Sequence, residues 1–276
     1  MQQTYIIAEI GINHNGSLER ACALIRVAAG CGVDAVKFQK RTIEVVYTPE
    51  ELAQPRASAF GTTNGDLKCG LEFGEAVYDR LAQEARACGL DWSASCWDVG
   101  SVEFLMRYDP PWLKVPSAKL TDHALVRVYR DTGKPLYVST GMSTWEEIDA
   151  ADVALRGGGP VTWVHCHSAY PSPVEEVNLA CIPAMRARYG RPVGYSSHTV
   201  SPWPCVMAVA LGAVAVEAHL TLDRALWGTD QAASLEPKAF AKMVEEIRTC
   251  ERAYGDGVKR VWPSEEPVRA KLRRHG

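Results

Sequence analysis

The stretch VGYSSHTVSPWPCVMAVALGAVAVEAHL (residues 193–220) contains the unit that decides the fold. Residues 193–199 and 213–220 are short runs bounded by turn residues, which is typical of buried strands. Residues 202–212 between them are apolar, begin with proline and end with glycine, as a helix does. A strand, a helix and a second strand in so few residues predict an α/β fold with a parallel sheet.

The same alternation recurs along the chain. The predicted strands are residues 4–12, 35–41, 91–97, 112–118, 135–141, 161–168, 193–199 and 213–220. The predicted helices are residues 17–32, 71–89, 101–108, 121–133, 143–158, 177–190, 202–212 and 236–255. Repeating units of this size predict a (β/α)8 TIM barrel in one domain over residues 1–276, with a doubly wound open sheet as the alternative.

Two segments lie outside this repeat. Residues 42–70 form a loop insertion rich in Pro, Gly, Thr and Asn, which is either a substrate cover or a disordered insertion. Residues 255–276 have no apolar periodicity and are predicted to form a surface tail on the barrel.

Composition limits the classes of function. The chain has 47% hydrophobic residues and a formal net charge of −3, and its acidic and basic residues are interspersed. These features give no indication of a nucleic-acid partner, a membrane partner or an export signal. The nine cysteines include no CxxC pair, so they are predicted to be free thiols in a reducing cytoplasm.

Polar side chains end all eight predicted strands, where a barrel carries its active site. They include Glu9, Gln39, Ser95, Ser117, Ser139, Ser168 and Ser196, with Asn13 and Tyr170 just beyond two of the strands. Lys37 and Lys114 lie on apolar strands, and a buried ammonium needs an anionic partner. If these lysines point inward, a phosphate or carboxylate ligand is a natural partner; otherwise they point outward between the helices.

Histidines end the last two strands. His198 and His219 would lie on adjacent strands, two residues after Ser196 and Glu217 respectively, so a two-histidine metal site with open positions is plausible. A single histidine at a strand end is more often structural. The run HCH at residues 165–167 resembles a metal motif, but we predict that it is not one. His165 and His167 would share the face directed at the mouth, and Cys166 would point away.

The motifs AEIGINHNGSLE, AVKFQK, LKVPSAKLTD, VSTGMST, HCHSAYPSP, GYSSHT, VEAHLTLDR and GTDQAASLEP follow one another along the chain. In this order they resemble the sialic acid synthase (N-acetylneuraminate synthase) family nearly end to end. The resemblance implies metal-dependent condensation of phosphoenolpyruvate with a sugar aldehyde, giving a 2-keto-3-deoxy acid and phosphate through C–O cleavage.

The resemblance also implies roles for individual residues. The positions of His198 and His219 would hold a divalent metal, Mn²⁺ first, with Mg²⁺ or Co²⁺ as alternatives. Glu9, Lys37, Lys114 and Glu217 are the catalytic candidates. The candidates for substrate contact are Asn13, Gln39, Ser95, Ser117, Ser139, Ser168, Tyr170, Ser196 and Asp230.

Several positions depart from the family's pattern. Ser197 stands where relatives have aspartate, and GTDQ replaces GPDH; most such departures keep the metal and phosphoenolpyruvate positions and alter the acceptor side or the residues behind the site. Relatives usually continue into an antifreeze-like domain that reaches across a homodimer, and this sequence ends at Gly276 before it. Two other readings stay open: a non-catalytic barrel subunit, and an aldolase with a Schiff base on Lys114 or Lys37.

Overall fold

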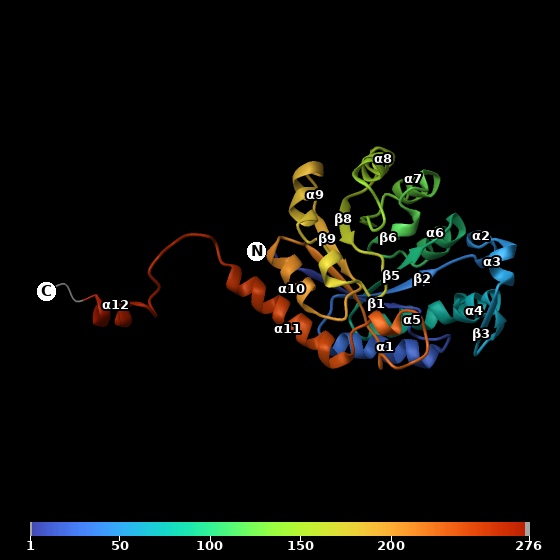
Figure 1. Cartoon of the computed structure of the whole chain (residues 1–276), viewed down its shortest axis with the longest axis horizontal. Helices are drawn as coiled ribbons and strands as arrows, with labels where there is room; N and C mark the ends of the chain where they lie inside the picture. The colour runs from blue at the N-terminus through green and yellow to red at the C-terminus, as the bar shows by residue number, and fades with distance from the viewer. Residues whose placement is uncertain (1, 274–276) are drawn as a thin grey trace.

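The computed structural model describes residues 2–273 and contains a closed barrel of parallel strands surrounded by helices (Figure 1). Around the barrel the strands follow the order β1-β10-β9-β8-β7-β6-β5-β2. Their bounds are β1 Tyr5–Gly11, β2 Ala35–Lys40, β5 Asp91–Cys96, β6 Leu113–Val115, β7 Leu136–Ser139, β8 Val161–Cys166, β9 Val193–Ser197 and β10 Ala215–His219. The predicted TIM barrel and all eight predicted strands are confirmed, and the open sheet is excluded because β1 pairs with both β10 and β2.

Each barrel strand is followed by a helix that covers the outside of the sheet (Figure 1). These helices are α1 Leu18–Gly30, α5 Glu75–Ala87, α6 Val99–Met106, α7 His123–Asp131, α8 Trp145–Leu155, α9 Cys181–Tyr189, α10 Trp203–Ala210 and α11 Pro237–Tyr254. All eight were predicted. The largest differences are at the starts of α5 and α9, each of which begins four residues later than predicted. Residue 71, the predicted start of α5, instead ends α4, and a 3₁₀ turn, Val174–Glu176, precedes α9.

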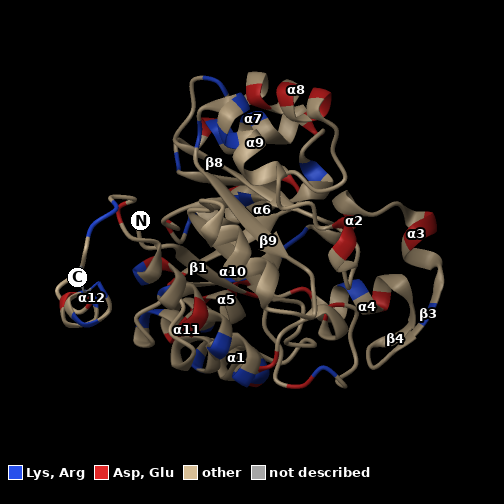
Figure 2. Cartoon of the chain, turned by 60° about the vertical axis from the view of Figure 1, so that its left-hand side comes forward, with Lys and Arg blue, Asp and Glu red and all other residues tan. Residues whose placement is uncertain are grey.

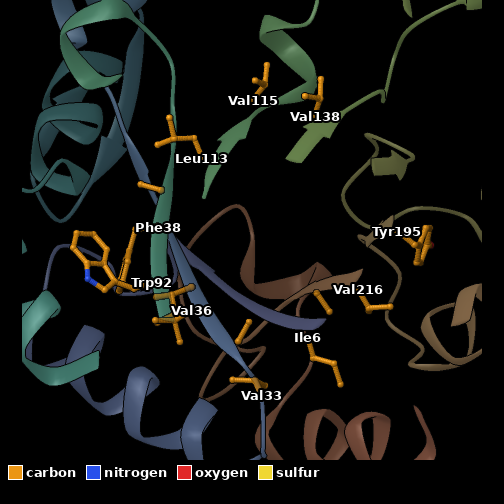
Figure 3. Close-up of a cluster of buried hydrophobic side chains, with 14 of the residues drawn as sticks. Ile6, Val33, Val36, Phe38, Trp92, Leu113, Val115, Val138, Tyr195 and Val216 are labelled. Carbon is orange, nitrogen blue, oxygen red and sulfur yellow. The ribbon is translucent and has the colours of Figure 1, made fainter. Parts of the chain in front are cut away.

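Alternate residues of each strand point to opposite sides of the barrel wall. Val36 and Phe38 of β2 belong to the main hydrophobic core, which lies between the strands and the helices (Figure 3). Lys37 and Gln39 alternate with them in sequence and line a pocket inside the barrel. Because successive side chains of a strand point to opposite faces, the packing residues and the polar residues of β2 lie on different sides of the barrel wall.

Aromatic side chains close the amino-terminal end of the barrel interior. Tyr5, Trp112 and Tyr137 pack against one another, with ring centroids 5.2–6.3 Å apart, and against the buried side chain of Ile7. Trp112 Nε1 donates a hydrogen bond to the Tyr5 hydroxyl, which in turn donates to Asp91 at 2.6 Å. We call these three rings the aromatic floor.

The insertion is folded, so the prediction of a disordered insertion is wrong. It contains α2 Ile43–Val46, α3 Pro49–Ala53, the antiparallel pair β3 Pro55–Ser58 and β4 Gly61–Thr63, and α4 Asn64–Leu71. Capping boxes at Thr48 and Thr63 start α3 and α4. Figure 2 shows these elements together at one edge of the barrel.

The carboxyl-terminal segment differs from the prediction. Residues 255–273 are exposed throughout, and α12, Glu266–Leu272, stands clear of the barrel instead of lying on it (Figure 1). Residues 274–276 of the predicted tail lie outside the described residues. The apolar side chains of residues 255–273, among them Val261 and Leu272, are few and not spaced on one face, so the segment has no apolar surface to bury against the barrel.

Two further findings concern residues 2–273. None of their helices has the length and the apolar character that a membrane crossing requires. All nine cysteines are free thiols, as predicted.

Candidate active site at the mouth of the barrel

A pocket opens at the carboxyl-terminal ends of the barrel strands, which we call the mouth. Thirteen of the fifteen predicted site residues line it: Glu9, Lys37, Gln39, Ser95, Lys114, Ser117, Ser139, Ser168, Tyr170, Ser196, His198, Glu217 and His219. They come from all eight barrel strands or from the loops that follow them. We call this hollow the site pocket.

Two buried lysines, each paired with a carboxylate, form the charged base of the site pocket. Lys37 Nζ lies 2.7 Å from Glu9 Oε2 and donates a hydrogen bond of 2.8 Å to Ser95 Oγ. Lys114 Nζ lies 2.8 Å from Glu217 Oε2. All four charged side chains are at least 93% buried, and Lys37 is also 3.8 Å from Glu217, so the two pairs form one network.

The two carboxyl groups have opposite pKa shifts. Burial raises the pKa of Glu9, against the opposing effect of Lys37. Burial also acts to raise the pKa of Glu217, but Lys114 and then Lys37 outweigh it and hold this pKa well below the ordinary carboxyl range. A pair of carboxyls whose pKa values are driven apart is suited to separate acid–base and electrostatic roles. Glu9 is therefore the group placed to exchange a proton.

The backbone at Gly11 leaves room for the Glu9 carboxyl. The pairing of β1 with β2 shifts register between Glu9 and Gly11, and Gly11 has φ +51°. A Cβ at Gly11 would lie 3.0 Å from Glu9 Oε1 and 3.1 Å from Gln39 Nε2, which itself donates a 3.1 Å hydrogen bond to that oxygen. Glycine at this position thus permits both the turn and the Glu9–Gln39 contact.

Hydroxyl groups surround the lysine–carboxylate network. Ser196 Oγ donates to Glu217 Oε1 at 3.0 Å, which fixes the second oxygen of that carboxylate. Ser117 Oγ accepts a 3.1 Å hydrogen bond from the Gly141 amide and lies 3.1 Å from Cys166 Sγ. Ammonium and hydroxyl donors converging in this way are suited to bind an anion with several oxygens.

His198 and His219 come from adjacent strands and meet at one side of the site pocket, with ring centroids 5.4 Å apart. Burial, followed by the charge of His219, lowers the pKa of His198 to about 3, so this ring is neutral at physiological pH. His198 Nδ1 hydrogen-bonds to the carbonyl oxygen of His167, which places the hydrogen on Nδ1 and leaves Nε2 with a free lone pair. Tyr170 stacks on the His198 ring at 4.0 Å.

Two predicted site residues do not line the site pocket. Asn13 is buried and donates from Nδ2 to Leu220 O and Ser234 Oγ, so it connects loops rather than facing the pocket. Asp230 lies behind His219, with Oδ2 3.8 Å from the histidine Nδ1.

The orientation predicted for strand residues 161–168 is wrong. His165 bonds to Val177 O, and His167 contacts Ser172 and Glu176, so neither histidine faces the site pocket. Cys166 faces it instead. The outward side chain of Trp163 sets the phase of this strand, because a residue two positions later must point the same way.

Sequence reasoning also missed other pocket-lining residues. Trp97 follows β5 directly, and Met142 follows the VSTG motif in a left-handed conformation with φ +61°. Their position just past strand ends is a signal for the mouth of a barrel, but their largely apolar side chains do not indicate a polar site.

Comparisons with known proteins agree on one family. A profile described as the NeuB family matches residues 24–259. Human N-acetylneuraminate-9-phosphate synthase is 36% identical over 97% of this chain and 76% of its own length. N,N'-diacetyllegionaminic acid synthase of Campylobacter jejuni is 34% identical over 96% of this chain and 82% of its own. The crystal structure of the sialic acid synthetase of Leptospira borgpetersenii, in complex with citrate, superposes with a TM-score of 0.86 at 29% identity, covering 99% of this chain and 94% of that one.

Proposed function

Since the chain belongs to the NeuB family, we propose that it condenses phosphoenolpyruvate with a sugar aldehyde to give a 2-keto-3-deoxy acid of the sialic acid type and phosphate. The single observation that carries this proposal is the buried network of Lys37, Lys114, Glu9 and Glu217 at the mouth. The free cysteines suit a reducing cytoplasm as the place of the reaction.

The charge balance of the site pocket favours an anionic substrate. Two ammonium groups face two carboxyls, so the base of the site pocket carries no excess negative charge that would repel an anion. Lys37 and Lys114 would then neutralise the phosphate and carboxylate of phosphoenolpyruvate. Ser95, Ser117 and Ser196 supply hydroxyl donors around them.

The proposed reaction proceeds in three steps, in which Glu9, Lys37 and Lys114 act. C3 of phosphoenolpyruvate attacks the aldehyde carbon, forming the C–C bond, and water adds at C2. Glu9 accepts one proton of that water and returns it to the alkoxide formed from the aldehyde. The tetrahedral intermediate then collapses to the ketone as the C2–O bond to phosphate breaks, and the proton of its C2 hydroxyl leaves with the phosphate. Lys37 and Lys114 hold the leaving phosphate throughout, and Glu217 fixes Lys114.

The histidine pair fits a divalent metal ion. Among residues 2–273 there is no group of three or more His, Cys, Asp or Glu side chains arranged to hold a metal, so a site here would have open positions. His198 offers a free Nε2 lone pair, and His219 Nδ1 is buried with no hydrogen-bond partner in the described chain. A bound Mn²⁺, or alternatively Mg²⁺ or Co²⁺, would supply Lewis acidity to the acceptor aldehyde.

His198→Gln is expected to weaken Mn²⁺ binding, measured by titration with electron paramagnetic resonance detection, by about 10- to 100-fold or more, because an imidazole ligand is lost. His165→Gln is the matched control, because His165 bonds to a backbone carbonyl away from the pocket and the same titration is expected to be unchanged. Equal Mn²⁺ affinity in wild type and His198→Gln would refute the two-histidine site.

Isotope labelling tests which bond of phosphoenolpyruvate breaks, C–O or P–O. Phosphoenolpyruvate labelled with ¹⁸O in the bridging position is expected to deliver the label to inorganic phosphate, because water at C2 supplies the ketone oxygen. Mass spectrometry of the released phosphate measures this. Label retained in the keto acid would mean P–O cleavage and would exclude the proposed role of Glu9.

A Schiff-base aldolase is disfavoured by the state of the lysines. Burial acts to lower the pKa of Lys37, but Glu217 and Glu9 outweigh it and raise the pKa. A lysine nucleophile needs the opposite shift. Lys114 is held by Glu217 at 2.8 Å, so both amines are ammonium donors rather than nucleophiles.

A further inference from the structure

The contact between β5 and β6 has fewer paired residues than any other contact around the barrel. Within the described chain β5 and β6 pair only at Ser95 and Lys114, whereas β2 and β5 pair at six positions. Pro110 and Pro111 lie just before β6, and Pro116 follows it directly. Proline has no N–H, so β6 cannot extend its ladder by donating from these positions. We call the contact between these two strands the β5–β6 seam.

Two hydroxyl groups add hydrogen bonds across the β5–β6 seam, one on each side of the paired residues. On the amino-terminal side, Ser93 Oγ donates to the carbonyl oxygen of Trp112 at 2.7 Å. On the carboxyl-terminal side, the hydroxyl of Tyr129 in α7 accepts a 3.0 Å hydrogen bond from the Cys96 amide. Its own hydrogen is shared between the carbonyl oxygens of Cys96, at 2.6 Å, and Lys114, at 2.9 Å. The Tyr129 hydroxyl therefore connects the end of β5 to β6.

The surroundings of Tyr129 make this connection hard to replace. Its side chain is fully buried, so water does not reach the hydroxyl. Burial also raises the pKa of Tyr129 well above its ordinary value, so the hydroxyl keeps its hydrogen and remains a donor. Without that hydroxyl the Cys96 amide and the Lys114 carbonyl would each lose a partner in a buried place, and unpaired buried backbone groups are costly.

The β5–β6 seam also separates the two ammonium groups of the site pocket. Lys37 donates to Ser95 of β5, whereas Lys114 belongs to β6, where Leu113 and Val115 on either side of it point into the hydrophobic core (Figure 3). A ligand with two anionic groups that binds both lysines depends on the distance between them, because charge-assisted hydrogen bonds are short and a small misplacement weakens them.

We propose that Tyr129 is a positioning residue, whose hydroxyl fixes β6 against β5 and thereby holds Lys114 at the distance from Lys37 that phosphoenolpyruvate requires. This inference rests on the proposed function, which names phosphoenolpyruvate as the ligand of the two lysines. Tyr129 does not line the site pocket, so it acts through the backbone of Lys114 and not by touching the substrate.

Tyr129→Phe tests the inference by removing the hydroxyl and keeping the ring. The dissociation constant for phosphoenolpyruvate, measured by calorimetry without an aldehyde so that no turnover occurs, is expected to rise by about tenfold or more. The midpoint of thermal unfolding is expected to fall by about 2–6 °C, because two buried backbone groups lose a partner.

Tyr78→Phe is the matched control. Tyr78 is buried to the same degree, and its hydroxyl also donates from a covering helix, α5, to a strand carbonyl, that of Gln39 in β2, at 2.9 Å. β2 is held by ladders to β1 and β5 on its two sides, so the loss of this hydroxyl does not loosen a short contact. A similar fall in the unfolding midpoint is expected, with the affinity for phosphoenolpyruvate unchanged within about threefold.

A mutant cycle distinguishes positioning of Lys114 from a general loss of structure. The background is the double variant Lys114→Met, Glu217→Gln, which removes the ammonium group without leaving an unpaired buried carboxylate. If Tyr129 acts through Lys114, adding Tyr129→Phe to this background is expected to weaken phosphoenolpyruvate binding by less than about threefold further. A general structural effect would instead add its full tenfold.

Three results would overturn the inference: wild-type affinity for phosphoenolpyruvate in Tyr129→Phe, equal losses of affinity in Tyr129→Phe and Tyr78→Phe, or full additivity in the cycle. The proposed reaction is judged separately by the condensation assay. Weaker binding confined to Tyr129→Phe would support the positioning role even if no aldehyde were condensed. Condensation by wild type and Tyr129→Phe with the same KM for phosphoenolpyruvate would support the reaction and refute the positioning role.

Discussion

Lys114→Met is expected to abolish phosphate release from phosphoenolpyruvate, with a loss of at least about a thousandfold in kcat/KM, and to destabilise the fold. The substitution removes a buried cation that lies 2.8 Å from Glu217 and leaves that carboxylate with Lys37 alone, at 3.8 Å. Breaking a buried ion pair by removing one partner costs about 3–5 kcal/mol, and the remaining Lys37 contact places this case at the lower end. Urea unfolding followed by circular dichroism measures the stability.

The double variant Lys114→Met, Glu217→Gln separates the two effects. Removing both charges leaves no uncompensated carboxylate, so most of the lost free energy of unfolding is expected to return. Activity is expected to stay absent because the phosphate has lost one of its two ammonium partners. An unfolding free energy for Lys114→Met equal to that of wild type would contradict the buried pair, and a double variant with restored activity would contradict its role in the site.

Glu9→Gln is expected to lower kcat by roughly 10²- to 10⁴-fold, the typical contribution of a positioned proton-transfer group, with KM for phosphoenolpyruvate changed by less than about threefold. Glutamine keeps the size of the side chain but cannot accept a proton. In wild type, kcat is expected to fall as the pH drops through the raised pKa of Glu9, because the protonated carboxyl is no longer a base. That acid limb of the pH profile is expected to disappear in Glu9→Gln.

Glu72→Gln is the matched control for this carboxyl. Glu72 is also paired with a lysine, Lys40, at 2.6 Å, and burial raises its pKa too, but it does not line the site pocket. The same substitution there is expected to leave kcat within about threefold and the pH profile unchanged. A Glu9→Gln enzyme with nearly full kcat and an intact acid limb would remove Glu9 from the proton-transfer step.

The alternation of side chains along each strand and the geometry of a barrel account for what the sequence could predict. Lys37 and Gln39 alternate with Val36 and Phe38, so one face of β2 had to be polar, and the carboxyl ends of all eight strands meet at one mouth. These two rules do not require knowledge of which strands are neighbours, so they could place thirteen predicted residues in one pocket. The ion pairs between strands are different, because the partner of each lysine depends on barrel order.

Where the predictions failed, the sequence did not show which face of a strand points inward, or the hydrogen bonds that cap a short helix were overlooked. In β8 the alternation of His165, Cys166 and His167 allows two phases, and packing of Trp163 against the helices selects the one that turns Cys166 inward. In the insertion, Pro and Gly content suggested disorder, yet Thr48 with Glu51 and Thr63 with Asp66 complete capping boxes. Asn13 was polar and adjacent to a strand end, but its amide is used by the backbone of Leu220.

The aromatic floor has a consequence for the order of events in turnover. Tyr5, Trp112 and Tyr137 seal the barrel beneath the lysine–carboxylate network, so a molecule held by Lys37 and Lys114 enters and leaves through the mouth. An acceptor lying over the histidine pair would cover that route. With these substrates the binding order would follow from the depth of the pocket: the three-carbon donor would enter first and the sugar second, and the donor could not leave until the sugar had departed.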